Sequence, residues 1–128
     1  MNIAMTGIFV KDTEEAFIIY TEKIGFVEVM HDPASNLAIV AADDAPDGTA
    51  LLLEPSSNPL AKEYREGLYT AGIPAIVFGS KDINADYERL KKNGIKFKND
   101  PLKTPYGMTA MFDDGCGNWI QIHQASEG

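Results

Sequence analysis

An internal repeat constrains the fold of this 128-residue chain more than any other feature of its sequence. "VKDTEEAFIIYTEKIGFVEVMHDP", which begins at Val10, and "SKDINADYERLKKNGIKFKNDP", which begins at Ser80, follow one plan. Each reads as Lys-Asp, an amphipathic stretch, a glycine, a short apolar run and Asp-Pro. Asp12 aligns with Asp82, and Gly25 aligns with Gly94 one residue out of step. The repeat indicates that one supersecondary unit is built twice.

Each repeat predicts a helix with its own start and stop signals. Asp12 and Asp82 are N-cap residues, and Glu15 is spaced to complete a capping box with Asp12. Gly25 and Gly94 supply left-handed conformations at the helix C-termini. Apolar residues recur at helical spacing, namely Ala16, Phe17, Tyr20 and Ile24 in the first repeat and Ile83, Tyr87 and Leu90 in the second.

One strand is predicted before each helix and three after it. The strands cover residues 3–10, 26–30, 36–41 and 49–54 in the first half, and 74–79, 95–98, 107–112 and 118–124 in the second. The unit is therefore β-α-β-β-β, twice. One helix to four strands covers one face of each sheet and leaves the other uncovered. We expect an α+β fold in which both modules form a cupped, barrel-like mixed sheet with the helices outside.

The segment that joins the two halves predicts a short helix within residues 57–72. Asn58 followed by Pro59 marks a helix start. Leu60, Tyr64 and Leu68 then fall on one face. A single domain follows, with module 1 at about 1–56, the linker helix, and module 2 at about 73–128.

Composition narrows the possible partners. The net charge of −8 repels phosphate backbones, so no nucleic acid is expected as a partner. The acidity either keeps the protein soluble or attracts a cationic ligand. No apolar run approaches the ~18 residues of a membrane span, and the N-terminus lacks signal-peptide character, so a cytoplasmic protein is expected. The lone Cys116 excludes an internal disulfide.

The last predicted strand, "NWIQIHQ", alternates polar and apolar side chains. Period-two alternation puts Trp119, Gln121 and His123 on one face and the two isoleucines on the other. Isoleucines suit the helix side, so the polar trio should face the cup. The other histidine, His31, is expected in a loop beside Asp32-Pro33.

The paired modules, with "VKDTEEAFIIYTEKIGF" and a final "GNWIQI", resemble the vicinal oxygen chelate superfamily. This group includes glyoxalases, bleomycin-resistance proteins and extradiol dioxygenases, and the resemblance covers nearly the whole chain. It implies the fold described above and a homodimer. In the enzymes it also implies one divalent metal. A His or Gln from the first strand of each half and a Glu from the last strand of each half hold that metal.

The implied metal ligands are largely replaced in this chain. The first-strand positions, seven residues before each helix-capping Asp, hold Met5 and Ala75. The last strand carries Gln121 in place of Glu. In the first half the counterpart is ambiguous: the strand offers Glu54, whereas the repeat offset of 69 or 70 points to Leu52 or Leu51. A thioether and a methyl group are poor ligands for a hard or borderline cation. We expect no metal cofactor, and Glu54 and Gln121 as the remaining ligands if one divalent metal does bind.

A ligand is expected in the cup. Its predicted binding residues are Met5, Leu52, Glu54, Tyr64, Ala75, Tyr106, Trp119, Gln121 and His123. His123 is the candidate hydrogen-bond partner or proton acceptor, and Glu54 is the candidate general base. The alternatives are a structural histidine, a solvated strand end at Glu54, and a Tyr64 that packs the linker helix onto the core.

Three functions are consistent with these features. The first is a metal-free protein that binds a small cationic or apolar molecule, similar in mode to bleomycin-resistance members that sequester a drug. The second is a lyase similar to lactoylglutathione lyase, or a related isomerase or dioxygenase, with an atypical site. The third is a non-catalytic scaffold, because fold alone does not settle function. The sequence leaves open whether the protein is an enzyme.

Overall fold

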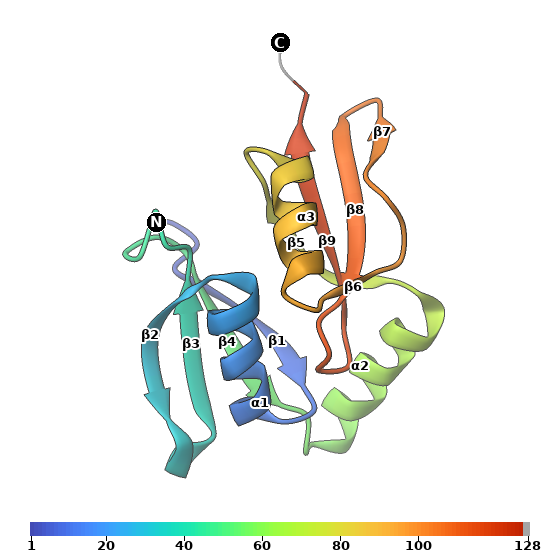
Figure 1. Ribbon diagram of the computed structural model, residues 1–128. Helices are drawn as coiled ribbons and strands as arrows, with labels where there is room; N and C mark the ends of the chain where they lie inside the picture. Colours follow the sequence, from blue (N-terminus) through green and yellow to red (C-terminus); the bar gives the residue numbers. More distant parts are fainter. Residues whose placement is uncertain (127–128) are drawn as a thin grey trace. The chain divides into compact units, whose positions relative to one another are not determined.

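The computed structural model describes residues 1–126, and the chain divides into two compact units, Met1–Glu66 and Gly67–Gly128 (Figure 1). Helix α2 (Pro59–Ala71) passes from the first unit into the second. Among the described residues, no helix is long and apolar enough to cross a membrane. Each unit has its own sheet and core, so each is described separately.

Within residues 1–66, four strands form a mixed sheet in the order β1-β4-β3-β2, in which β1 and β4 run parallel. The elements are β1 (Met5–Val10), α1 (Thr13–Ile18), η1 (Ile19–Ile24), β2 (Val27–Asp32), η2 (Pro33–Ser35), β3 (Leu37–Ala41) and β4 (Ala50–Pro55). The predicted β-α-β-β-β order is confirmed for this half.

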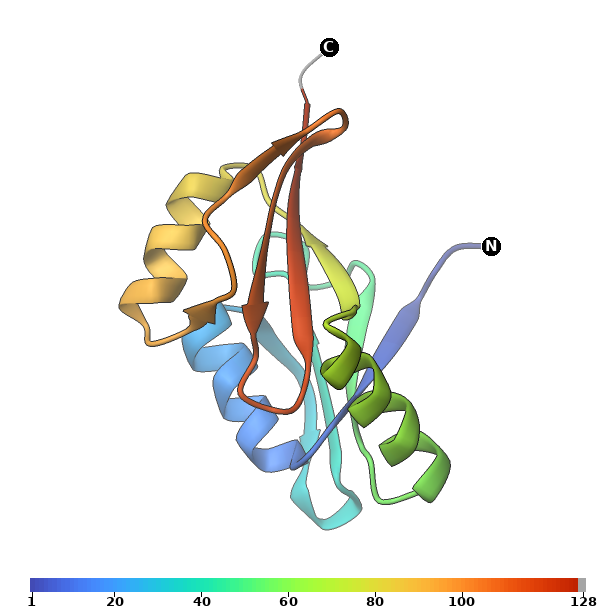
Figure 2. The same ribbon diagram turned by 90° about the vertical axis from the view of Figure 1, so that its right-hand side faces the viewer.

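The first helix begins and ends where the sequence predicts. The Asp12 carboxylate accepts a hydrogen bond from the Glu15 backbone N–H at 3.0 Å, and Gly25 ends the helix at a φ of 101°. Between them the α-helix passes into a π-helical turn from Ile19. Figure 2 shows this blue helix along one side of its strands. The core between helix and sheet contains Ile8, Val10, Ala16, Tyr20, Ile24, Ala38, Val40, Leu51 and Leu53.

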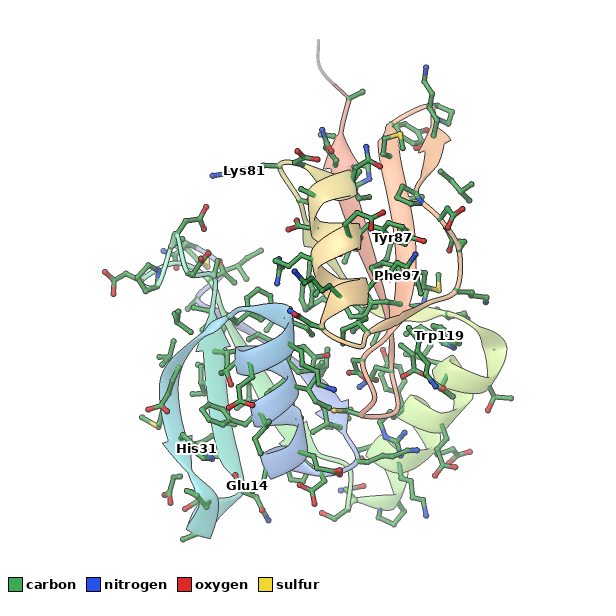
Figure 3. All side chains as sticks on the ribbon, in the orientation of Figure 1. Glu14, His31, Lys81, Tyr87, Phe97 and Trp119 are labelled. Carbon is green, nitrogen blue, oxygen red and sulfur yellow. The ribbon has the colours of Figure 1, made fainter. Side chains whose placement is uncertain are left out.

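The loop prediction for His31 is wrong, because β2 continues to Asp32 and His31 pairs with Ala38 of β3. The His31 ring stacks on Phe17 of α1 with ring centroids 3.9 Å apart. Its Nε2 lies 2.7 Å from the Glu14 carboxylate (Figure 3). His31 therefore joins the edge strand β2 to the helix.

Within residues 67–126, five strands form the second sheet in the order β5-β9-β8-β6, with β7 also paired to β8. The elements are β5 (Pro74–Gly79), α3 (Ile83–Lys92), β6 (Lys96–Phe97), β7 (Leu102–Thr104), β8 (Gly107–Asp113) and β9 (Trp119–Ala125). The sequence did not predict β7. It is a three-residue strand held by the hairpin turn, where the Thr104 hydroxyl donates to the Gly107 carbonyl at 3.0 Å. So short a strand shows no readable alternation.

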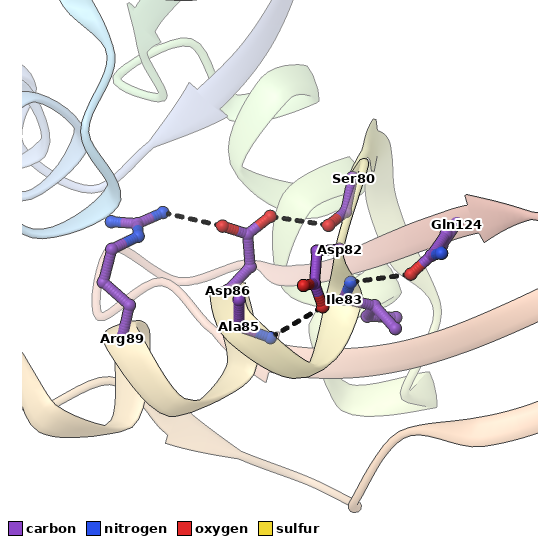
Figure 4. A network of polar contacts seen from close by, with 7 residues as sticks. All are labelled: Ser80, Asp82, Ile83, Ala85, Asp86, Arg89 and Gln124. Atoms are coloured by element: carbon purple, nitrogen blue, oxygen red, sulfur yellow. Dashed lines mark hydrogen bonds and ion pairs between the residues drawn. The ribbon is translucent and has the colours of Figure 1, made fainter.

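Helix α3 is capped from two directions. The Asp82 carboxylate accepts from the Ala85 backbone N–H at 3.1 Å, as the repeat predicts. The Gln124 side-chain oxygen of β9 accepts from the Ile83 N–H at 2.8 Å (Figure 4). The second contact ties the start of the helix to the end of the last strand.

The core of the second unit lies between α3 and one face of its sheet, and Figure 2 shows the helix on one side of β8 and β9. Phe97 bridges the two, with its ring centroid 4.6 Å from Tyr87 of α3 and 5.4 Å from Phe112 of β8. The buried apolar residues here are Ile83, Tyr87, Leu90, Ile95, Ala110, Phe112, Ile120 and Ile122.

Helix α2 matches the predicted linker helix. The Asn58 side chain accepts from the Leu60 backbone N–H at 2.9 Å, which confirms the predicted start. Its buried residues, however, are Ala61 and Arg65 rather than the predicted apolar face. Tyr64 remains 59% exposed.

Gly67 provides a test of helix propensity in α2. A Cβ at Gly67 would contact nothing within 4 Å, so Gly67→Ala is expected to raise the free energy of unfolding by about 0.5–1 kcal/mol. Gly72→Ala is the matched control, because its φ of +73° and the nearby Lys98 ammonium disfavour a side chain. In urea unfolding, the midpoint of Gly67→Ala should rise and that of Gly72→Ala should fall relative to the native protein. Equal shifts would contradict the prediction.

Candidate functional site

The sheet of the first unit has an open face opposite α1. Register pairs Gly7 with Leu52 and Phe9 with Glu54, so these four residues share that face with Met5. Ile8, Val10, Leu51 and Leu53, which alternate with them, are buried in the core. We call Met5, Gly7, Phe9, Leu52 and Glu54 the first open face.

The second unit has an equivalent open face. Trp119, Gln121 and His123 are half-buried, whereas the isoleucines between them are buried. The predicted alternation along this strand is confirmed. We call the trio and its register partners, apart from Pro74 at the irregular start of β5, the second open face. It comprises Val77, Gly79, Thr109, Met111, Asp113, Trp119, Gln121 and His123.

Strand register identifies the true counterpart of Gln121 in the first module. Leu52 pairs with Gly7, and Gln121 pairs with Val77. Gly7 and Val77 are related by the 70-residue offset that also relates the two helix caps. Leu52 is therefore the repeat equivalent of Gln121, and Glu54 lies one step further along the same face.

The same reasoning shows that the two acid–base candidates are equivalent residues of the two repeats. Glu54 is the register partner of Phe9, and His123 is the register partner of Gly79. Because Phe9 and Gly79 are also related by the repeat offset, Glu54 and His123 occupy equivalent positions in their modules.

The Glu54 carboxylate lies over Gly7. A Cβ on Gly7 would be 2.9 Å from Glu54 Oε2, so the glycine leaves the space that the carboxylate occupies. Within residues 1–126 the Glu54 side chain has no hydrogen bond or ion pair. The Phe9 ring lies next to it in register and makes an edge contact with Tyr64, with centroids 6.3 Å apart. The first open face thus carries a carboxylate and the Phe9 ring, and Phe9 in turn contacts Tyr64.

Trp119 is anchored by residues that the sequence did not indicate. Its indole N–H donates to the Tyr69 carbonyl at 3.1 Å, and the two rings stack with centroids 5.4 Å apart. The Lys98 ammonium lies 5.1 Å from the centroid of the indole ring (Figure 3 labels Trp119). The Tyr69 hydroxyl donates to the Asp113 carboxylate, and this hydrogen bond raises the pKa of Tyr69.

The other predicted binding residues differ in burial and in their place in the second sheet. Gln121 and His123 are half-buried, and their side chains form no hydrogen bond within the described part of the chain. Ala75 lies at an irregularity in the β5–β9 pairing and is half-buried. Tyr106 lies in the β7–β8 turn at 78% exposure, beside the Ala125 end of β9, so the strand separates it from Trp119.

Comparison with known proteins identifies the family. The profile of the glyoxalase/bleomycin resistance protein/dioxygenase superfamily matches residues 2–122. The chain belongs to this superfamily. The predicted resemblance is thereby confirmed.

A curated relative and two solved structures match nearly the whole chain. It is 45% identical to "Uncharacterized protein YurT" of Bacillus subtilis (strain 168), over 97% of this chain and 99% of the relative. The solved structure of UcmS2 matches with a TM-score of 0.82 and 27% identity, covering 96% of this chain and 97% of that one. TnmS3, described as an antibiotic binding protein from Streptomyces sp. CB03234, matches with a TM-score of 0.75 and 27% identity, covering 98% and 97%.

The residues at the superfamily's metal positions do not fit a divalent metal here. With the register settled, these positions hold Met5, Leu52, Ala75 and Gln121. This set offers a thioether, two hydrocarbon side chains and one amide, and it lacks the charged oxygen and imidazole donors that such ions need. Within residues 1–126 there is also no group of three or more His, Cys, Asp or Glu side chains that could hold a metal ion.

Proposed function

We propose that the protein binds a small planar molecule, preferably a cationic aromatic one, through its open sheet faces and without a metal cofactor. One observation carries the proposal. The Glu54 carboxylate, which has no partner within residues 1–126, lies on the same apolar face as Phe9, whose ring contacts Tyr64. A carboxylate next to aromatic rings attracts a cation by charge and by the negative faces of the rings.

The surroundings of that carboxylate support a sequestering role. Met5 and Leu52 share its face and offer apolar contact area. The net charge of −8 adds a long-range attraction for cations. The 27% identity to TnmS3, a protein described as antibiotic-binding, is consistent with small-molecule binding in this branch of the superfamily. Homodimerisation is part of the proposal, and sedimentation velocity tests it.

Glu54→Gln tests the charge preference. We expect the variant to bind proflavine, a planar aromatic cation, about tenfold more weakly, because it loses a charge-assisted contact. The affinity for the neutral 9-anthracenemethanol should stay within twofold of that of the native protein, because this compound is held by apolar contact and the substitution leaves the apolar area unchanged. Fluorescence titration of each compound measures both affinities.

The matched control is Glu63→Gln, which removes an exposed carboxylate of α2 in the same unit. It should leave proflavine binding unchanged. An equal loss in both variants would show that net acidity, rather than the Glu54 position, attracts the cation. Failure of both compounds to bind the native chain would remove the proposal.

A metal-independent lyase is the competing function, favoured by the equivalent positions of Glu54 and His123 in the two modules. Turnover of the hemithioacetal of methylglyoxal and glutathione, without added metal, would support it. Loss of that turnover in both Glu54→Gln and His123→Ala would assign proton transfer to this pair. No turnover, together with proflavine binding, favours sequestration.

A further inference from the structure

A hollow of about 590 Å³ lies in the first unit and is distinct from the first open face. The start of α1, the end of β4 and the first turns of α2 form its wall, and none of the predicted ligand residues lines it. We call it the α1–α2 hollow. Its volume falls in the range of small-molecule sites, ~300–1,000 Å³.

Cationic side chains gather at the hollow, although the chain as a whole is acidic. Lys11, Lys62 and Arg65 all line it. Arg65 is only 5% exposed, and its Nε donates to the Ser56 hydroxyl at 3.1 Å. That hydroxyl in turn donates to the Val10 carbonyl at 2.9 Å. The guanidinium is therefore held in a defined place by the end of the sheet.

The two carboxylates of the hollow are both engaged by donors of the chain. Asp12 accepts from the Glu15 backbone N–H at 3.0 Å. Glu14 directs its carboxylate to His31 Nε2, 2.7 Å away (Figure 3). The lining carries three cationic and two anionic side chains, and the exposed Glu66 carboxylate lies 3.8 Å from Lys62 Nζ and 4.0 Å from the Arg65 guanidinium. The hollow is therefore less acidic than the protein as a whole, whose net charge is −8.

Thr13 provides an independent sign of a ligand. It is 3% exposed and lines the hollow, yet its hydroxyl has no hydrogen-bond partner within residues 1–126. Buried hydroxyls are normally satisfied, because an unpaired one loses its hydration without compensation. A hydroxyl can donate to an anion, and a bound oxyanion would supply the missing partner.

We propose that the α1–α2 hollow binds the oxyanion group of a small molecule, either a carboxylate or a phosphate. Arg65 and Lys62 supply positive charge, and the Thr13 hydroxyl donates a hydrogen bond. The volume leaves room for a molecular body beyond the oxyanion itself. The site is independent of the ligand proposed for the open faces.

Nuclear magnetic resonance of the full ¹⁵N-labelled chain tests the site. Sodium phosphate and sodium acetate are titrated separately at constant ionic strength, with sodium chloride as the reference. We expect saturable shifts of the amides of Thr13, Ser57 and Lys62 with at least one of the two anions. The anion that saturates first identifies the oxyanion class. Shifts no larger than those in chloride, for both anions, would overturn the proposal.

Thr13→Val separates binding from folding, because valine keeps the shape of threonine and removes the unpartnered hydroxyl. The substitution should weaken binding of the anion about fivefold, as expected for one lost hydrogen bond. Its urea midpoint should equal or exceed that of the native chain. Lys62→Gln should also weaken binding of the anion, whereas Lys103→Gln in the other unit should leave it unchanged. Unchanged affinity in Thr13→Val, or equal losses in both lysine variants, would contradict a defined site.

Discussion

Phe112→Ala is expected to lower the free energy of unfolding by about 3–5 kcal/mol, the largest effect we expect from a single side chain. Phe112 is fully buried under α3 and contacts Phe97, which in turn contacts Tyr87 of the helix. Removing the ring leaves a cavity that the neighbouring rings of Phe97 and Tyr87 cannot fill unless the helix moves. Urea unfolding followed by the fluorescence of Trp119, the single tryptophan, measures the loss.

The neighbouring residue in β8 is the control for Phe112. Met111 lies on the opposite face of the strand and is half-buried. Met111→Ala should cost about 1 kcal/mol, because part of its apolar surface already contacts water. If both variants lost the same stability, the assignment of core and open faces in the second sheet would be wrong.

Gly107→Ala is expected to cost about 3 kcal/mol or more, through backbone strain and overlap rather than a cavity. Gly107 begins β8 at a φ of +139°, and an added Cβ would overlap the Gln124 carbonyl and lie 2.8 Å from the Ser126 backbone nitrogen. The β8–β9 pairing must therefore open at this end to accept alanine. Thermal unfolding, with hydrogen exchange of the β9 amides, should show both the lower midpoint and the local opening.

Gly79→Ala is the control for this steric argument. Gly79 belongs to β5 in the same sheet, and a Cβ there would contact nothing within 4 Å. Its replacement should leave stability unchanged or raise it by about 0.5–1 kcal/mol. A loss comparable to that of Gly107→Ala would show that glycine composition, rather than crowding at the β8–β9 end, sets the effect.

The two binding proposals use different chemistry, and this difference makes them separable. The first open face offers the Glu54 carboxylate and two aromatic rings. The α1–α2 hollow offers cations and the Thr13 hydroxyl. A cation and an oxyanion should therefore bind the same unit without competing. Proflavine titrations with and without saturating anion can check this independence.

The candidate site could be predicted in part from the repeat and from strand alternation. These local patterns correctly placed Trp119, Gln121 and His123 on one face of β9. They could not decide between Leu52 and Glu54 as the counterpart of Gln121, because strand register depends on a partner strand far away in the sequence. The parallel β1–β4 pairing decided it in favour of Leu52.

The sequence by itself determined the order of elements in the two β-α-β-β-β modules, apart from the short strand β7, together with their helix caps and the linker helix. Each of these depends on residues within a few positions of one another, such as Asp12 and the backbone N–H of Glu15. The same local signals carried the resemblance to the superfamily, whose family model matches residues 2–122.

Only the tertiary structure decided which side chains meet. The stacking of Trp119 on Tyr69, the contact of Glu14 with His31, and the presence of Arg65 and Thr13 in the lining of one hollow all join different elements. Such contacts depend on sheet register and helix packing, which a short window of sequence does not contain. The open faces could therefore be expected from the sequence, whereas the α1–α2 hollow could not.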